Sequence, residues 1–308
     1  MNPPKTQSRI RVVEVGPRDG LQSQTRTLTL EQKEAWIRAL AAAGLTRIEA
    51  GSFVSPKRVP AMADTAPLLQ RLSDLKGVEL SVLVPNEQGL EAALLSGARH
   101  VAVFTATTDS FCQRNVGVGR EESLKHYEVI CRRAQLEGLG LRGYISCVFD
   151  CPFEGAVDPQ ATLEVGKALV EMGCSELSLG DTLGTGDPRR SALLYAQAIA
   201  AFGPRRVAGH FHDTWGRGLA SALAAYQVGV RIFDSSGGGL GGCPFAPGAG
   251  GNVATEDLVA LFEAMEVSTG INPNLLHESS RILAGALGAP PPSRAFAARE
   301  AGLKKPTV

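Results

Sequence analysis

The sequence has no excess of either charge and no long hydrophobic run. Its 308 residues include 31 basic and 31 acidic side chains, so the formal net charge is zero. Binding to nucleic acid or to a membrane surface usually needs a basic excess, and we therefore expect neither kind of partner. No apolar stretch approaches the roughly 18 residues that a membrane-spanning helix requires, so we expect no membrane span.

Signals for export and for disulfide formation are also missing. The opening MNPPKTQSRIRVVEV lacks the apolar core of a secretory signal peptide. The six cysteines are scattered over a long chain, which is typical of reduced thiols. These absences predict a cytoplasmic protein.

What the sequence has is a recurring type of element: short β-branched apolar runs with helical patterns between them. The predicted strands are 11–15, 47–50, 80–84, 100–104, 143–149, 176–179, 206–211 and 231–234. None alternates strictly between polar and apolar residues, as is typical of strands buried on both faces of a parallel sheet. Signals of helix ends lie between them, such as the capping box of Thr29 with Gln32 and the N-cap Asp158 before a proline.

Eight strands alternating with helices predict an α/β protein, a (β/α)8 TIM barrel with a C-terminal helical extension. An open doubly wound sheet is the alternative, and the length also permits two domains. We expect one catalytic domain over residues 1–288, with the barrel at about 10–236, a glycine-rich loop at 237–251 and C-terminal helices at 255–288. Residues 289–308, proline-rich and then basic, are expected to form a surface tail.

Two histidines in the segment GHFHDT stand out on the seventh predicted strand. Side chains alternate along a strand, so His210 and His212 face the same side. In a barrel that side is the interior, close to the strand ends where the sites of such barrels lie. The pair therefore favours a metal site, with two hydrogen-bonded core histidines as the alternative.

An aspartate and a carboxamide complete a set of metal ligands. Asp19 follows the first strand in EVGPRDGLQ, and the first and seventh strands lie close across the rim of a closed barrel. With the two histidines and Asn252, it predicts a mixed nitrogen and oxygen site suited to Mg²⁺ or Mn²⁺. Aspartate before glycine is equally typical of a simple turn.

Three further charged residues stand at the ends of predicted strands. Arg18 there can stabilise an enolate or bind a carboxylate. Glu49 and Asp181 can orient that arginine or transfer protons. Taken singly, each is also compatible with an ordinary rim residue or salt bridge.

The glycine-rich segment GGGLGGCPFAPGAGGNVATED contains Cys243. Its first glycines match the spacing GxGxxG, but prolines follow where a helix should begin, so we reject nicotinamide binding. We expect a mobile lid that carries Cys243 inward as acid, base or nucleophile. A surface loop with an incidental thiol is the alternative.

Together these segments resemble the 3-hydroxy-3-methylglutaryl-CoA (HMG-CoA) lyase family, in its bacterial type. The resemblance rests on EVGPRDGLQ, EAGSFVSPK, LSLGDT, GHFHDT and GGLGGCPFAPGAGGNVATEDL and extends over residues 10–287. It implies a TIM barrel that cleaves HMG-CoA to acetyl-CoA and acetoacetate with a divalent cation. It also implies an acyl-CoA substrate and a homodimer.

The resemblance assigns a role to each candidate residue. Asp19, His210, His212 and Asn252 become the metal site, with Asn252 allowed a longer distance. Arg18 stabilises the enolate and Cys243 is the catalytic thiol. The remaining residues are Glu49 and Asp181 as acid, base or orienting groups, and Ser52, Ser178 and Thr182 as polar lining of the substrate site. Whether Cys243 or Asp181 takes the first proton stays open.

The chain departs from the family pattern in two places and leaves other activities to consider. Residues 22–26, QSQTR, stand where family members often carry an acidic and then a basic residue, and Phe245 stands where tyrosine is common. One alternative is a lyase for glutaryl-CoA substrates with a longer 3-substituent. Another is a condensing enzyme like isopropylmalate or homocitrate synthase, although those lack the GGCP segment.

Overall fold

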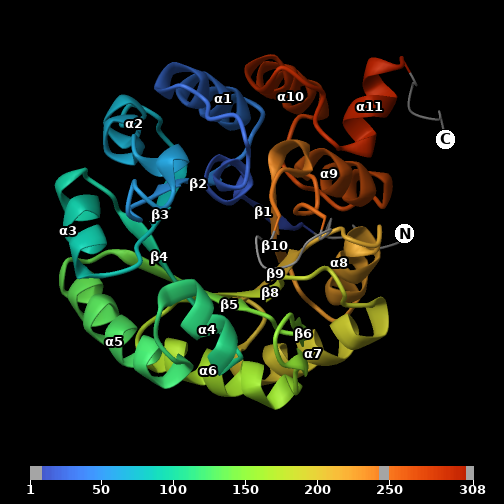
Figure 1. Cartoon of the computed structure of the whole chain (residues 1–308). Coiled ribbons are helices and arrows are strands. Elements are labelled where there is room, and N and C mark those ends of the chain that lie inside the picture. The colour runs from blue at the N-terminus through green and yellow to red at the C-terminus, as the bar shows by residue number, and fades with distance from the viewer. Residues whose placement is uncertain (1–8, 243–249, 303–308) are drawn as a thin grey trace, which may run out of the picture.

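The computed structural model describes residues 9–242 and 250–302, and its centre is a closed barrel of parallel strands (Figure 1). The strand order around the barrel is β1-β10-β9-β8-β5-β4-β3-β2. The strands are β1 (Arg11–Glu14), β2 (Arg47–Ser52), β3 (Glu79–Leu83), β4 (His100–Ala106), β5 (Gly140–Ser146), β8 (Glu176–Asp181), β9 (Val207–Phe211) and β10 (Ile232–Ser235). The predicted TIM barrel is confirmed, and the open sheet is excluded because β1 pairs with both β2 and β10.

Helices surround the barrel and form the outer layer (Figure 1). They are α1 (Leu30–Ala42), α2 (Thr65–Arg71), α3 (Glu87–Leu95), α5 (Arg120–Leu136), α6 (Pro159–Glu171), α7 (Pro188–Phe202) and α8 (Gly218–Gln227). Their first turns carry the predicted caps: Thr29 and Gln32 form a capping box on α1, and Asp158 caps α6. Within the described residues, no helix combines the length and apolar character needed to cross a bilayer.

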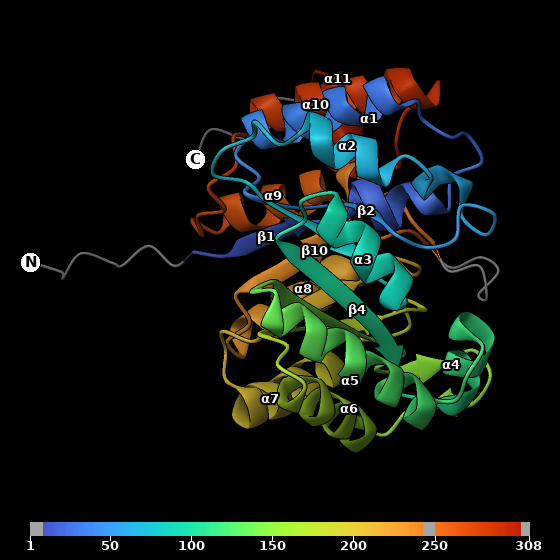
Figure 2. The ribbon, with the colours of Figure 1, turned by 90° about the vertical axis from the view of Figure 1, so that its left-hand side faces the viewer.

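Three helices follow the barrel, and one of them packs against its first helix. They are α9 (Thr255–Ala264), α10 (Pro273–Leu287) and α11 (Arg294–Glu300). In both views α10 lies beside α1, and the two helices are in contact (Figures 1 and 2). The C-terminal helical extension is therefore a structural partner of the segment that follows β1.

Residues 289–302, part of the expected surface tail, include a short helix, α11. Ser293 accepts a hydrogen bond from the amide of Phe296 and so caps α11, while its hydroxyl donates to Asp257. Phe296 is buried and stacks at 5.2 Å between ring centroids with His277 of α10. This aromatic contact and this cap, together with ion pairs from Glu300 to His277 and Arg281, hold a short helix against the extension.

Two further elements lie at the carboxyl ends of the strands. Helix α4 (Asp109–Val116) stands beyond the end of β4 (Figure 2), and β6 (Asp150–Cys151) pairs with β7 (Gly155–Ala156) in a small hairpin. The sequence pattern predicted neither. Helix α4 adds a wall to the candidate site through Phe111, Asn115 and Val116.

The barrel interior contains both an apolar cluster and a group of buried charges. Val13, Ala208 and Ile232 form a small apolar cluster with Val15. Arg142 on β5 is buried and forms ion pairs with Glu176, the first residue of β8, and with Asp234 on β10. Pairing offsets the cost of burying these charges, and the pairs connect the start of β8 to the strand that supports the site.

Candidate functional site

A cavity of about 730 Å³ opens at the carboxyl ends of the strands. The sequence-predicted residues that line it are Arg18, Asp19, Ser178, Thr182, His210 and His212. This is where the sites of TIM barrels are built.

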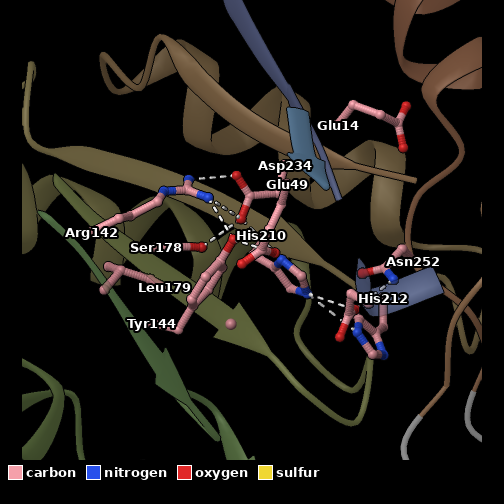
Figure 3. Close-up of polar contacts among 12 residues, drawn as sticks. Glu14, Glu49, Arg142, Tyr144, Ser178, Leu179, His210, His212, Asp234 and Asn252 are labelled. Atoms are coloured by element: carbon pink, nitrogen blue, oxygen red, sulfur yellow. Dashed lines mark hydrogen bonds and ion pairs between the residues drawn. The ribbon is translucent and has the colours of Figure 1, made fainter. Parts of the chain in front are cut away.

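Three of the predicted metal ligands meet in this cavity. His210 lies on β9, His212 directly follows it, and Asp19 lies in the short helical turn η1 (Gly16–Gly20) after β1. One ligand atom from each lies within 4.8 Å of the others. The Nε2 atoms of the two histidines are 3.4 Å apart (Figure 3), and Nε2 of His210 is 4.0 Å from Oδ2 of Asp19.

The protonation states of this triad suit a cation. Burial, and then the neighbouring His210, lower the pKa of His212 to about 4, so its imidazole is neutral at pH 7. Burial alone would raise the pKa of Asp19, but Arg18 and the two histidines outweigh it and lower that pKa. The triad therefore offers a carboxylate and a neutral ring, and Nδ1 of His212 is buried without a partner in the described structure.

Asp234 on β10 fixes the orientation of His210. Its Oδ2 lies 3.1 Å from Nδ1 of His210, which leaves Nε2 facing the triad. Arg142 binds both oxygens of Asp234, at 2.5 and 3.2 Å, and Ser178 donates to Oδ2 at 2.7 Å. Burial would raise the pKa of Asp234, but Arg142 and His210 outweigh it and lower the pKa below its ordinary value. A carboxylate behind a ligating histidine is the usual support of a metal site.

Asn252 is adjacent to the triad but binds it through its amide nitrogen. Nδ2 donates to Oδ2 of Asp19 at 2.8 Å and to the carbonyl of Leu240 at 3.0 Å. The backbones of His212 and Asn252 also pair in an isolated bridge. In this arrangement Asn252 holds the carboxylate of Asp19 in place.

Arg18 is oriented by a buried acid and an aromatic ring. Its Nε and Nη2 each donate to Oε2 of Glu49 at 2.8 Å, and its Nη1 donates to Asp19 at 2.7 Å. The hydroxyl of Tyr144 donates to the same Oε2 at 3.0 Å, and its ring lies under the guanidinium at 5.3 Å. Glu49 is fully buried behind Arg18 and is not part of the cavity wall. Its position is that of an orienting group.

These contacts connect into one chain of hydrogen bonds around the site. Arg142 also donates to the hydroxyl of Tyr144 at 2.8 Å, so the chain passes from Asp19 through Arg18, Glu49, Tyr144, Arg142 and Asp234 to His210. Figure 3 shows the part of it from Glu49 to His210. Sequence reasoning missed Arg142, Tyr144 and Asp234. The available signal was the charge of Arg142 and Asp234 inside two otherwise apolar strands.

The other predicted residues lie in different places. Asp181 accepts hydrogen bonds from the amides of Thr185 and Gly186 and does not line the cavity; burial raises its pKa to about 6. Ser52 donates to the carbonyl of Leu83 and also lies off the cavity wall. Thr182 lines the cavity, where its hydroxyl accepts the amide of Cys147.

Cys243 and Phe245 lie outside the described residues. The described residues that flank them are Gly242 and Gly250. Gly242 lines the cavity, and the amide of Gly250 donates to Oγ1 of Thr214 at 3.0 Å.

Comparison with known proteins identifies close relatives over the full length. The chain is 45% identical to hydroxymethylglutaryl-CoA lyase of Pseudomonas mevalonii, over 95% of this chain and 98% of that protein. It is also 45% identical to a 3-hydroxy-3-isohexenylglutaryl-CoA/hydroxymethylglutaryl-CoA lyase of Pseudomonas aeruginosa, over 96% of this chain and 97% of that protein. Both relatives are named lyases, so the condensing-enzyme alternative has no support here.

Solved structures agree with these sequence relatives. The crystal structure of hydroxymethylglutaryl-CoA lyase from Pseudomonas aeruginosa matches with a TM-score of 0.93 and 43% identity, covering 96% of this chain and 98% of that one. An HMG-CoA lyase from Acinetobacter baumannii, in complex with coenzyme A and 3-methylmalate, matches with a TM-score of 0.92 and 33% identity, covering 98% of each chain. The predicted resemblance and the predicted lyase class are confirmed. Residues 9–283 match the HMGL-like family model, and the chain belongs to that family.

Proposed function

We propose that this chain cleaves HMG-CoA to acetyl-CoA and acetoacetate, with one divalent cation held by Asp19, His210 and His212. The observation that carries the proposal is the meeting of this triad with Arg18 in one cavity. Near full-length relatives named for the same reaction support it.

Mg²⁺ and Mn²⁺ are the metals that the donor set favours. It combines a carboxylate oxygen with two imidazoles, no described cysteine belongs to it, and such mixed sites suit these ions better than zinc. When bound, the cation supplies a Lewis acid that lowers the pKa of the substrate's tertiary hydroxyl. Asn252 supports the site by holding the carboxylate of Asp19.

The reaction is a retro-Claisen cleavage. The tertiary hydroxyl gives up its proton, its oxygen forms the carbonyl of acetoacetate, and the broken carbon–carbon bond leaves its electron pair on acetyl-CoA as an enolate. Arg18 lies beside the triad with its charge toward the cavity, so it offsets the negative charge of the enolate. The enolate carbon then takes up a proton to give acetyl-CoA.

We assign proton transfer to Cys243 and orienting roles to Glu49 and Asp181. Both oxygens of Asp181 accept backbone amides of the 182–186 loop, away from the cavity wall. Replacing Cys243 by alanine should abolish cleavage and leave metal binding intact. Replacing Cys174, a buried cysteine in the outer layer, by alanine is the matched control and should leave the rate unchanged. Equal rates for both variants would exclude Cys243.

The cavity also has an apolar wall suited to part of an acyl-CoA. Val54, Leu83, Phe104, Phe111 and Val116 line it together with the polar groups. A second candidate substrate is therefore a glutaryl-CoA with a longer apolar 3-substituent, as in the name of the second Pseudomonas relative. The ratio of kcat/KM for 3-hydroxy-3-isohexenylglutaryl-CoA to that for HMG-CoA tests this alternative, and a ratio near zero would exclude it.

The remaining proposals concern the setting of the enzyme. We propose a cytoplasmic homodimer whose catalytic domain spans residues 1–288. Cys112, Cys131, Cys151 and Cys174 belong to no disulfide among the described residues, which supports a reducing compartment. Light scattering of the purified chain would measure the oligomeric state.

The decisive experiment is release of acetoacetate from HMG-CoA. Exhaustive chelation should abolish the release, and added Mg²⁺ or Mn²⁺ should restore it. Full activity after chelation would contradict the metal assignment.

A further inference from the structure

Two buried carboxylates without a cationic partner lie behind the metal triad. Glu14 ends β1 and is 0% exposed, and Glu256 lies in the first turn of α9 and is 6% exposed. In the described part of the chain, their hydrogen-bond partners are backbone amides and hydroxyls. Burying an unpaired carboxylate is costly, and burial accordingly raises the pKa of both groups to about 7. The proposed reaction uses neither group.

Glu14 connects three segments that are far apart in the sequence. Its Oε1 accepts the amide of Gly16 at 2.7 Å and the amide of Gly237 at 2.8 Å. Its Oε2 accepts the hydroxyl of Thr255 at 2.6 Å. Figure 3 shows the Glu14 carboxylate turned away from the Asp234 network. It therefore joins the turn η1, the turn η3 (Gly237–Gly239) and the start of α9 from outside the cavity.

Glu256 holds the next amide of the same turn. Both its oxygens lie 2.9 Å from the amide of Gly238, and the hydroxyl of Ser280 on α10 donates to Oε1. Gly238 has φ of 71°, a conformation that side chains other than glycine rarely adopt. A Cβ at Gly237 would approach Trp36 to 2.8 Å. The path of η3 is thus tightly determined by its two carboxylates and its surroundings.

The three segments that Glu14 joins each lead to the triad. Turn η1 carries Asp19, and the residue after η3 is Leu240, whose carbonyl accepts Nδ2 of Asn252. Asn252, three residues before Thr255, donates from the same Nδ2 to Asp19. A shift of any one segment would therefore move the bond between Asn252 and Asp19.

We propose that Glu14, assisted by Glu256, is a positioning residue that sets the geometry of Asp19 and Asn252 for metal binding. This inference rests on the metal site of the proposed function. It gives a positioning role to two buried acids that contact neither the substrate nor the metal. Partners of this outer kind typically contribute about 10- to 100-fold to metal affinity or activity.

The test compares Glu14→Gln with the wild-type chain by two readouts. Glutamine keeps the shape and one acceptor oxygen, but it cannot accept bonds from both the amides and Thr255. We expect the Kd for Mn²⁺, measured by calorimetry without substrate, to rise about tenfold. We also expect kcat to fall by a similar factor while KM for HMG-CoA changes less than threefold. Glu256→Gln should act in the same direction with a smaller effect, because it is one segment further from Asp19.

A stability control separates positioning from mere folding. Leu169→Ala removes a buried side chain on α6, on the other side of the barrel from α9, and should lower Tm without changing the Kd for Mn²⁺. A Glu14→Gln protein with lowered Tm but wild-type Kd and kcat would show that the carboxylate is only structural and overturn the inference. If Glu14→Gln does not fold, Thr255→Val removes one donor alone, and Thr255→Ser should restore the wild-type Kd. A wild-type Kd in Thr255→Val as well would likewise overturn it.

The same measurements distinguish the inference from the proposed function. A wild-type chain that binds Mn²⁺ without cleaving HMG-CoA would contradict the proposed reaction, while the ratio of Kd values would still test Glu14. If the wild-type chain cleaves HMG-CoA and the Glu14→Gln variant has the same kcat and the same Kd for Mn²⁺, only the inference is contradicted.

Discussion

The two sides of the metal triad are held by different kinds of interaction. On the strand side, His210 is fixed by Asp234, which binds the buried cation Arg142. On the turn side, Asp19 is approached by segments that buried Glu14 holds through amides and a hydroxyl. The pKa of Asp234 is lowered, whereas burial raises that of Glu14 to about 7.

This difference follows from what each side must do. The strands β5, β8, β9 and β10 pair side by side in fixed register, so a paired charge between β5 and β10 can be placed with rigid geometry. The turn side must bring together segments far apart in the chain, since Glu14 and Thr255 are 241 positions apart. A carboxylate accepts several bonds at once, which makes it suited to joining such segments. We expect a substitution on the strand side to lower stability by leaving a buried charge unpaired. We expect the stability contributed by the turn side to change with pH.

The largest effect is expected for Arg142→Leu on the strand side. The substitution leaves Asp234 and Glu176 buried without their common cation. Breaking a buried pair in this way costs about 3–5 kcal/mol, which urea unfolding measures as a lower midpoint. A control at the exposed Lys125–Glu121 pair, Lys125→Leu, should change the midpoint little. A similar loss in both variants would mean that the network adds no specific stability.

Replacing Arg18, where the two sides meet, should affect catalysis more than folding. Arg18→Gln retains some hydrogen bonding to Glu49 but loses the charge that offsets the enolate. The expected cost is about 3 kcal/mol in the transition state, so kcat should fall over 100-fold while KM changes little. Steady-state kinetics with HMG-CoA give both values. An unchanged kcat with a raised KM would instead make Arg18 a substrate-binding residue.

The dependence of stability on pH should distinguish the turn side from the strand side, because Glu14 titrates near neutral pH. The pKa of Glu14 is about 7 in the folded chain, above the ordinary value of 4.5, so the folded state binds more protons between these values. Stability from this group is therefore greatest below about pH 4.5 and is lost as the pH rises through about 7. The depressed pKa of His212 acts in the opposite direction between about pH 4 and 6.5, so the difference between variant and wild type is the informative quantity.

Glu14→Gln removes the titrating group and should become more stable relative to wild type as the pH rises from 5 to 8. The expected gain in relative unfolding free energy over this range is about 2 kcal/mol. Urea unfolding at pH 5, 6, 7 and 8 measures it. Parallel curves for Glu14→Gln would contradict a raised pKa of Glu14 in the folded chain.

The barrel and the centre of the site could be predicted from local patterns. The spacing of His210 and His212 put both rings on one face of a strand whatever lay around them, and strand ends located Arg18 and Asp19 at the mouth. Asp234 and Arg142 could not be assigned, because their roles depend on a contact 92 residues away across the barrel. The role of Glu14 could not be predicted for the same reason, since its partners Gly237 and Thr255 lie more than 200 positions further along the chain.

Asp181 is a residue for which a local pattern led to the wrong placement. Its position at a strand end predicted a group facing the mouth, but alternation along β8 turns Ser178 and Gly180 to the cavity and Asp181 away from it. The two-residue period was present in the sequence and would have placed Asp181 correctly if the register of β8 had been known. Register depends on neighbouring strands, which one sequence does not specify.

The smallest effect is expected for Ser178→Ala on the strand side. Ser178 supplies one of several hydrogen bonds to Asp234, and Arg142 and His210 remain after its removal. A single hydrogen bond to a charged group that keeps other partners contributes about 1 kcal/mol or less, so the Kd for Mn²⁺ should rise less than fivefold. Calorimetry on Ser178→Ala and Thr255→Val then compares one lost donor on each side of the triad. We expect the turn-side variant to lose more affinity, because Oε2 of Glu14 has Thr255 as its hydroxyl donor while Asp234 retains a bidentate arginine. A larger loss in Ser178→Ala would reverse the comparison and make the strand side the more fragile support of the metal.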